Sequence, residues 1–208
     1  MNIKKTLLLV GAALHLVNAS AQAGSLEVLT GNNATTVDAK LYTEINPNVG
    51  IFLRNRLTDP YQGSISGFGV ADLVANFWKG DFGTIGGVAE ALFPYGGKTD
   101  PRLAVLYSGT QGPVKEAVQV TGGLGSKTFE LWGQGTYSIP ISEGINLESG
   151  LEFVSNFGVQ GHNFSRQSPR LGIRSGDVSG LKVGVGADVI ETPKETKFNV
   201  GVFGEYGF

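Results

Sequence analysis

The sequence contains no cysteine, only two histidines and no excess of basic residues. Without cysteine the chain has no disulfide framework, no thiolate nucleophile and no thiolate metal ligand. His15 lies near the N-terminus, which leaves only His162 in the body of the chain, so we expect no metal site and no cofactor. The 16 Lys and Arg residues face 18 Asp and Glu residues, and this balance excludes the basic surface typical of nucleic-acid-binding proteins.

The sequence also lacks an apolar run long enough to cross a bilayer as a helix, which needs about 20 residues. Its longest apolar stretch, Leu7–Val17, follows a pair of lysines and precedes the small residues of Ala21-Gln22-Ala23. A charged region, a short apolar region and an A-x-A site in that order are typical of a cleaved signal peptide. We therefore expect residues 1–23 to be a signal peptide and residues 24–208 to form the exported protein.

Glycine is abundant, and the sequence alternates. There are 32 glycines among the 208 residues, about twice the usual share of roughly 7%. Apolar residues alternate with small or polar ones with a period of two, whereas the 3.6-residue period of helices is hard to find. In Thr128–Ile139, for example, Phe129 and Leu131 share one face while Glu130 and Gln134 share the other. This pattern predicts an all-β protein.

The last strand of this pattern ends the chain. Every second residue from position 198 is apolar except Gly204, and the terminal Phe208 follows Tyr206 by two positions. A closing strand with this alternation and a terminal aromatic residue resembles that of Gram-negative outer-membrane β-barrels. The resemblance implies a location in the outer membrane, contact with its lipid, and recognition of Tyr206 and Phe208 by the barrel assembly machinery.

Local alternation divides the mature chain into strands separated by turn signals. The segments are 25–30, 35–45, 48–57, 66–79, 82–93, 102–109, 115–124, 127–140, 144–157, 169–175, 179–191 and 196–208. Longer connections are expected at 58–64, 94–101 and 158–168. If the last strand ends in the periplasm, all three fall on the extracellular side, and the tight Asn-Pro-Asn, Gly-Asp and Ser-Glu-Gly turns at 46–48, 80–81 and 142–144 fall on the periplasmic side, as in bacterial barrels.

We therefore expect a closed, antiparallel, up-and-down transmembrane β-barrel of about twelve strands. Three segments, 25–30, 102–109 and 169–175, are shorter than the ~9–11 residues that a tilted spanning strand needs. Ten strands would result if two of them were loops, and eight would require joining segments across breaks. A soluble β-sandwich would show similar alternation, but the signal peptide and the aromatic terminus favour the barrel.

In a barrel of this kind the polar alternates face the lumen. The lumen-facing candidates are Lys40, Glu44, Arg54, Arg56, Asp72, Glu90, Glu130, Glu148, Glu152, Lys182, Asp188 and Glu205. They carry both signs of charge. Such residues line a water-filled pore or fill a narrow barrel with internal ion pairs, and strand number decides between these outcomes because the diameter grows with it.

An enzymatic function has one candidate group of residues. His162 and Ser165, with an acid such as Glu152, could form a hydrolase site at the outer edge of a barrel. Their spacing matches no hydrolase motif, and no G-x-S-x-G sequence is present. We therefore assign no catalytic residue.

The sequence favours a narrow outer-membrane porin or channel for small solutes. A structural or interaction barrel with a filled lumen and functional outer loops is the alternative, and an outer-membrane hydrolase is a third hypothesis.

Overall fold

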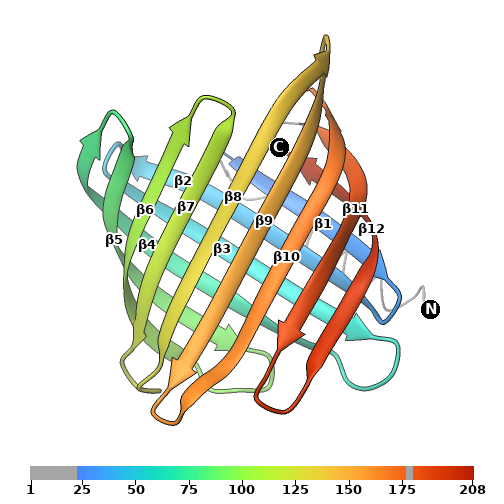
Figure 1. The fold of residues 1–208 in the computed structure, drawn as a ribbon. Coiled ribbons are helices and arrows are strands. Elements are labelled where there is room, and N and C mark those ends of the chain that lie inside the picture. The colour runs from blue at the N-terminus through green and yellow to red at the C-terminus, as the bar shows by residue number, and fades with distance from the viewer. Residues whose placement is uncertain (1–22, 177–179) are drawn as a thin grey trace.

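The computed structural model describes residues 23–176 and 180–208, and these residues form twelve strands and no helix (Figure 1). The strands are β1 Ala23–Gly31, β2 Ala34–Asn46, β3 Val49–Pro60, β4 Ser66–Gly80, β5 Gly83–Pro94, β6 Asp100–Gln111, β7 Val114–Gly123, β8 Phe129–Ser142, β9 Ile145–Gly158, β10 Gly161–Ser175, β11 Leu181–Glu191 and β12 Thr196–Gly207. Among the described residues, no helix is long and apolar enough to cross a membrane. The expected signal peptide lies outside this part of the chain except for Ala23.

Each strand pairs antiparallel with its neighbours in sequence, and β1 pairs with β12 to close the barrel. The closing register joins Ser25 to Gly207 at one end and Gly31 to Gly201 at the other. At the chain terminus, Gly24 donates a backbone hydrogen bond to Phe208 (2.8 Å) and accepts one from it (3.0 Å). The prediction of a closed up-and-down barrel of about twelve strands is confirmed, and the alternatives of ten and eight are wrong.

The three segments that looked too short are complete strands. They are the central parts of the longer strands β1, β6 and β10, because pairing with the neighbouring strands continues beyond the residues that alternate clearly. The expected connection over 158–168 is wrong. β10 begins at Gly161, whose positive φ of 103° closes a tight turn with Gly158, and Arg166 and Ser168 in this stretch are buried, lumen-facing strand positions.

The two ends of the barrel differ in their connections. At the end that holds the chain terminus, the strands are joined by tight turns at Pro47–Asn48, Asp81–Phe82, Gly112–Pro113 and Glu143–Gly144. At the other end the longest connections run over 61–65, 95–99 and 124–128. Short periplasmic turns and longer extracellular loops are typical of outer-membrane barrels, so the end with the tight turns is called the periplasmic end below.

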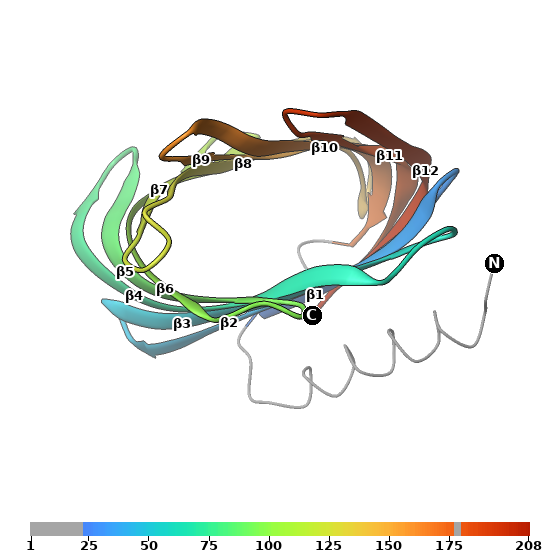
Figure 2. The same ribbon diagram turned by 90° about the horizontal axis from the view of Figure 1, so that it is seen from below.

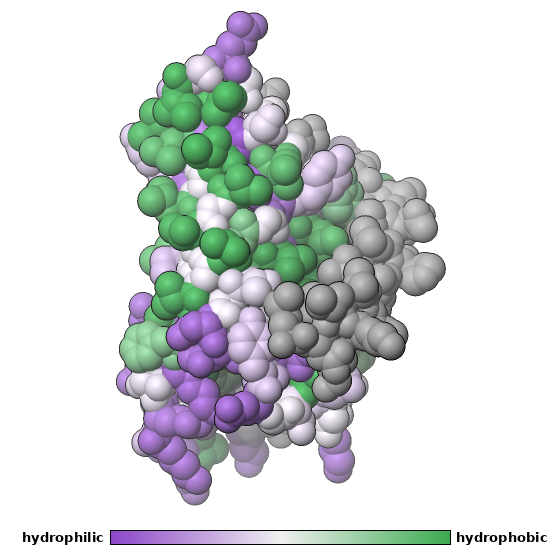
Figure 3. Space-filling model, turned by 90° about the vertical axis from the view of Figure 1, so that its right-hand side faces the viewer, coloured by the Kyte–Doolittle hydropathy of each residue, from purple (hydrophilic) through white to green (hydrophobic). Residues whose placement is uncertain are grey.

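The outward face of the barrel is apolar. In Figure 3 the hydrophobic residues gather in a band, with hydrophilic residues below and above it. The side chains in this band are exposed because alternation points them away from the lumen; they include Leu73, Leu103, Val105, Val120, Leu151, Leu171, Val185, Val200 and Val202. Exposed apolar side chains over a closed barrel are stable in lipid, so this band is the membrane-facing surface.

The view along the barrel shows a wall that encloses an oval rather than a circle (Figure 2). Most of the buried residues are polar or charged and lie on the inner face of this wall, whereas few apolar residues are buried. We therefore expect the functional site to lie in the lumen.

Candidate functional site: the barrel lumen

A group of charged residues, here called the ion-pair bridge, crosses the lumen between β2–β3 and β9–β10. Its members are Asp38, Lys40, Arg54, Glu152 and Arg166. Glu152 on β9 accepts hydrogen bonds from Arg54 of β3 (2.8 Å), Lys40 of β2 (3.1 Å) and Arg166 of β10 (2.7 Å). By strand order β3 and β9 lie opposite each other in the closed barrel. The Arg54–Glu152 pair therefore spans the lumen and holds two opposite sides of the wall together.

Asp38 anchors the bridge to its own side of the wall. Its carboxylate accepts two hydrogen bonds from Arg54, one of them from Nε at 2.9 Å, and a third from Arg56 Nη1 at 3.1 Å. Arg56 continues to Asp188 of β11 at 2.7 Å. The side chains of all four residues are at most 6% exposed. Forked guanidinium–carboxylate pairs of this kind fix geometry strongly, so the bridge is a rigid partition.

On the side of the bridge that contains β1, β11 and β12, side chains fill the lumen. Arg170 donates to Glu27 (2.8 Å) and Asp188 (3.1 Å), and Arg174 donates to Glu148 (2.9 Å) and Glu205 (2.7 Å). Lys182 joins the second group through Glu148 at 3.3 Å.

The ring of Phe203 occupies the same half of the lumen. It lies 5.7 Å from the guanidinium of Arg170 and 5.5 Å from the ammonium of Lys182. Gly172 and Gly184 form a cross-strand pair next to this ring, and a Cβ on Gly172 would lie 3.1 Å from it. Glycine at these positions allows Phe203 and its two cations to pack against the wall, so they occupy this half of the lumen.

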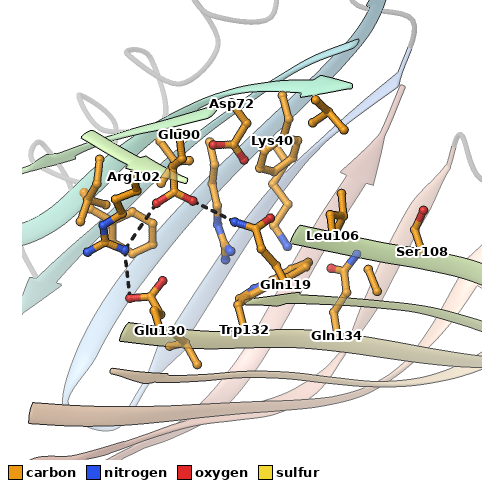
Figure 4. A pocket seen from close by; sticks show the side chains of 18 of the residues that line it. Lys40, Asp72, Glu90, Arg102, Leu106, Ser108, Gln119, Glu130, Trp132 and Gln134 are labelled. Carbon is orange, nitrogen blue, oxygen red and sulfur yellow. Dashed lines mark hydrogen bonds and ion pairs between the residues drawn. The ribbon is translucent and has the colours of Figure 1, made fainter. Parts of the chain in front are cut away.

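On the other side of the bridge lies a cavity of about 500 Å³, which is lined by β4–β8 and by the parts of β2, β3, β9 and β10 that border the bridge. Figure 4 shows Asp72, Glu90 and Arg102 on one wall of this cavity, with Glu130 and Gln119 facing them. Arg102 contacts Glu90 at 3.4 Å and Glu130 at 3.3 Å, and Gln119 donates to Glu90 at 2.9 Å. These contacts join β5 to β6 and β7, and β6 to β8, so they tie together one stretch of the cavity wall.

The cavity also has aromatic walls. Tyr42, Phe52, Phe68, Trp132 and Phe164 line it. The Phe68 ring faces the bridge, since the guanidinium groups of Arg54 and Arg166 each lie 5.7 Å from its centroid. Three buried polar atoms at the cavity have no hydrogen-bond partner among the described residues, namely Asp72 Oδ1, Trp132 Nε1 and Arg166 Nε. An aromatic surface with a few unpaired polar groups is suited to small polar solutes.

The sequence-predicted lumen residues fall into three groups. Lys40, Arg54 and Glu152 belong to the bridge, with Arg56 and Asp188 attached to it. Glu148, Lys182 and Glu205 lie in the filled half, and Asp72, Glu90 and Glu130 line the cavity. Glu44 lies at the periplasmic end of β2, where it is exposed and outside the cavity.

Sequence reasoning missed several residues that organise the lumen: Glu27, Asp38, Arg102, Arg166, Arg170 and Arg174. Arg166 lies in the stretch 158–168 that was predicted as a connection, whereas Arg170 and Arg174 lie in the predicted strand 169–175 but were not among the lumen-facing candidates. The signal for β10 is the alternation of buried polar side chains at Arg166, Ser168, Arg170 and Arg174, which only Gly172 interrupts. The partner of each charge depends on contacts across the lumen, which alternation does not show.

The structure brings together two of the three residues considered for a hydrolase site. His162 Nε2 lies 2.8 Å from Ser165 Oγ, and Ser165 Oγ lies 3.0 Å from Ser155 Oγ. Ser155 and Ser165 alternate with the cavity-lining Val154 and Phe164, so they lie on the outer face of the wall. Glu152 is bonded inside the lumen on the opposite face. The expected combination with Glu152 is therefore wrong, and no carboxylate among the described residues hydrogen-bonds to His162.

Known proteins match this chain in structure but not in sequence. No protein-family model and no curated protein sequence matches. Two solved structures of KdgM porin, one of them titled as a complex with disordered oligogalacturonate, have TM-scores of 0.58 and 0.57 with 11% identity. Each comparison covers 89% of this chain and 99% of the porin. The closed twelve-stranded β-barrel of this chain is therefore similar in fold to KdgM porin.

Proposed function

We propose that this protein is a narrow outer-membrane channel for small polar solutes, and that its path runs along the β4–β8 side of the lumen. The observation that carries the proposal is the cavity of about 500 Å³ beside the ion-pair bridge. Eight strands enclose an interior that side chains can fill, and the diameter grows with strand number. Twelve strands therefore leave space that the bridge and the filled half occupy only in part.

The connections of the barrel are consistent with an open path. Within the described residues, the longest extracellular connections are 61–65, 95–99 and 124–128. Segments of this length are too short to fold into the lumen and close it. They also offer little surface for a partner protein, which weakens the alternative of an interaction barrel with functional outer loops.

An acidic oligosaccharide such as the one named for KdgM porin is not the solute that we propose. The lumen arginines of this chain are engaged by carboxylates; Arg54 binds Asp38 and Glu152, and Arg170 binds Glu27 and Asp188. A paired guanidinium attracts an anionic solute less than a free one does. The solute is therefore small, polar and not polyanionic.

The route to the membrane is part of the same proposal. Residues 1–23 direct export and are removed, and the barrel assembly machinery then recognises the closing strand through Tyr206 and Phe208. The two rings stack with centroids 6.3 Å apart beside the seam where β1 meets β12, which supports a role for them in closure.

Single-channel recording in planar bilayers tests the channel. Ala117 is 7% exposed and lines the cavity, whereas its neighbour Val118 is 39% exposed and faces outward. We expect the folded protein to conduct and Ala117→Trp to lower the conductance by roughly half or more, because the indole fills part of the cavity through which the proposed path runs. Val118→Trp is the matched control and should conduct normally. Absence of current from the folded wild-type barrel would refute the channel and favour a filled structural barrel.

A further inference from the structure

The cavity contains a buried acid without a partner. Asp72 lies on the inner face of β4, is 7% exposed and makes no hydrogen bond or ion pair with any described residue. Its Oδ1 atom is fully buried. The other carboxylates at the cavity are engaged, since Glu90 contacts Arg102 and Gln119 and Glu130 contacts Arg102 and Asn156. Buried polar atoms in proteins are nearly always paired, so an unpaired one requires an explanation.

The surroundings of Asp72 are acidic on one side and aromatic on the other. In the barrel register Asp72 lies directly opposite Glu90 on β5 and Phe52 on β3, and Phe52 lies opposite Tyr42 on β2. All four side chains line the cavity, and Figure 4 shows Asp72 next to Glu90 on its wall. A row of two carboxylates and two aromatic rings thus faces the open space.

Cations of the protein do not neutralise this region. Arg102 is shared by Asp100, Glu90 and Glu130, so three carboxylates already compete for one guanidinium. Lys40, which lies at the bridge border of the cavity, is bound to Glu152 at 3.1 Å. The β4–β6 wall therefore carries an excess of negative charge, and a cation in the cavity would be attracted to it.

We propose that Asp72, with Glu90, Phe52 and Tyr42, forms a subsite for the primary ammonium or guanidinium group of a small solute. Such a group donates N–H hydrogen bonds to the unpaired Oδ1 and neutralises the carboxylate. Its positive charge is also attracted to the faces of aromatic rings. The inference rests on the proposed channel and specifies its solutes as organic cations that carry N–H donors.

The requirement for a donor makes the subsite testable with two probes. n-Butylguanidinium donates hydrogen bonds, whereas tetramethylammonium has the same charge and none to donate. The chain has two tryptophans, and only Trp132 lines the cavity. In a Trp78→Phe background, the fluorescence of Trp132 therefore reports binding in the detergent-folded barrel without any need for current.

We expect n-butylguanidinium chloride to change the Trp132 fluorescence saturably and tetramethylammonium chloride at equal ionic strength to change it little. Asp72→Asn should weaken binding of n-butylguanidinium about tenfold or more, because it removes the charge from a charge-assisted hydrogen bond. Asp81→Asn removes an equal charge from an exposed periplasmic turn and should leave binding unchanged.

Heat-modifiable migration in gels verifies that each variant is folded before titration. Equal affinity in Asp72→Asn and the parent, or equal binding of the two probes, overturns the inference. If the barrel conducts but shows no Asp72-dependent binding, the subsite fails and the channel stands. If it binds n-butylguanidinium as expected but does not conduct, the channel fails and the subsite stands.

Discussion

Replacement of Asp38 by asparagine tests whether the ion-pair bridge holds the barrel together. The new carboxamide would keep one acceptor oxygen for Arg54 Nε, now at 2.9 Å, but its NH₂ group would face two guanidinium donors, including Arg56 Nη1 at 3.1 Å. Asp38 and both arginines are buried. Breaking a buried ion pair by removing one partner costs about 3–5 kcal/mol, because it leaves an uncompensated charge. We expect a loss of this size in the free energy of unfolding.

The assay is equilibrium unfolding in urea with the barrel folded into lipid vesicles, monitored by the heat-modifiable gel shift. The matched control is Glu195→Gln, which removes one carboxylate from the Lys197–Glu195 pair, whose side chains are 65% and 55% exposed. An exposed pair is worth about 0–1 kcal/mol. If Asp38→Asn loses no more stability than Glu195→Gln, the bridge is hydrated and flexible, and its role as a rigid partition is refuted.

Four further outcomes are expected. Gly184→Ala should cost about 1–3 kcal/mol in unfolding experiments, since its Cβ would press on the backbone of β10, whereas Gly204→Ala, with no atom within 4 Å of the added Cβ, should be tolerated. Glu152→Gln leaves three bridge cations without their shared anion. The reversal potential measured in a salt gradient should therefore shift in the direction of anion selectivity, and the conductance should rise. Deletion of Phe208 should lower the amount of folded barrel in outer-membrane fractions. Mass spectrometry of the purified protein should show a chain that begins at Gly24.

The fold was largely predictable because local sequence patterns define the strands and turns of a barrel wall. Alternation indicates each strand, and glycine, proline or asparagine indicates each turn. Twelve segments could therefore be placed without knowledge of which strands pair with each other. The error at 158–168 has a physical reason. Polar side chains that face a lumen look like loop residues when the alternating partners, such as Gln167 and Pro169, are not strongly apolar.

The sequence predicts which charged residues face the lumen, but not which of them form ion pairs. Alternation identifies Arg54 and Glu152 as lumen residues, yet they are 98 positions apart and meet only because β3 and β9 lie opposite each other. The role of Phe203 depends equally on the cross-strand glycines beside it. Whether a charge is paired, and with what, is therefore decided by the closed barrel and not by the strand that carries it.

The bridge explains how a twelve-stranded barrel can have a path much narrower than its wall allows. Ion pairs that join opposite strands draw two sides of the wall together, which accounts for the oval outline in Figure 2. They also divide the lumen, so that Phe203 and its paired cations occupy one half and the cavity lies in the other. Because almost every other lumen charge is neutralised in this arrangement, the unpaired carboxylate of Asp72 gains an influence on solutes that one acid among many free charges would not have.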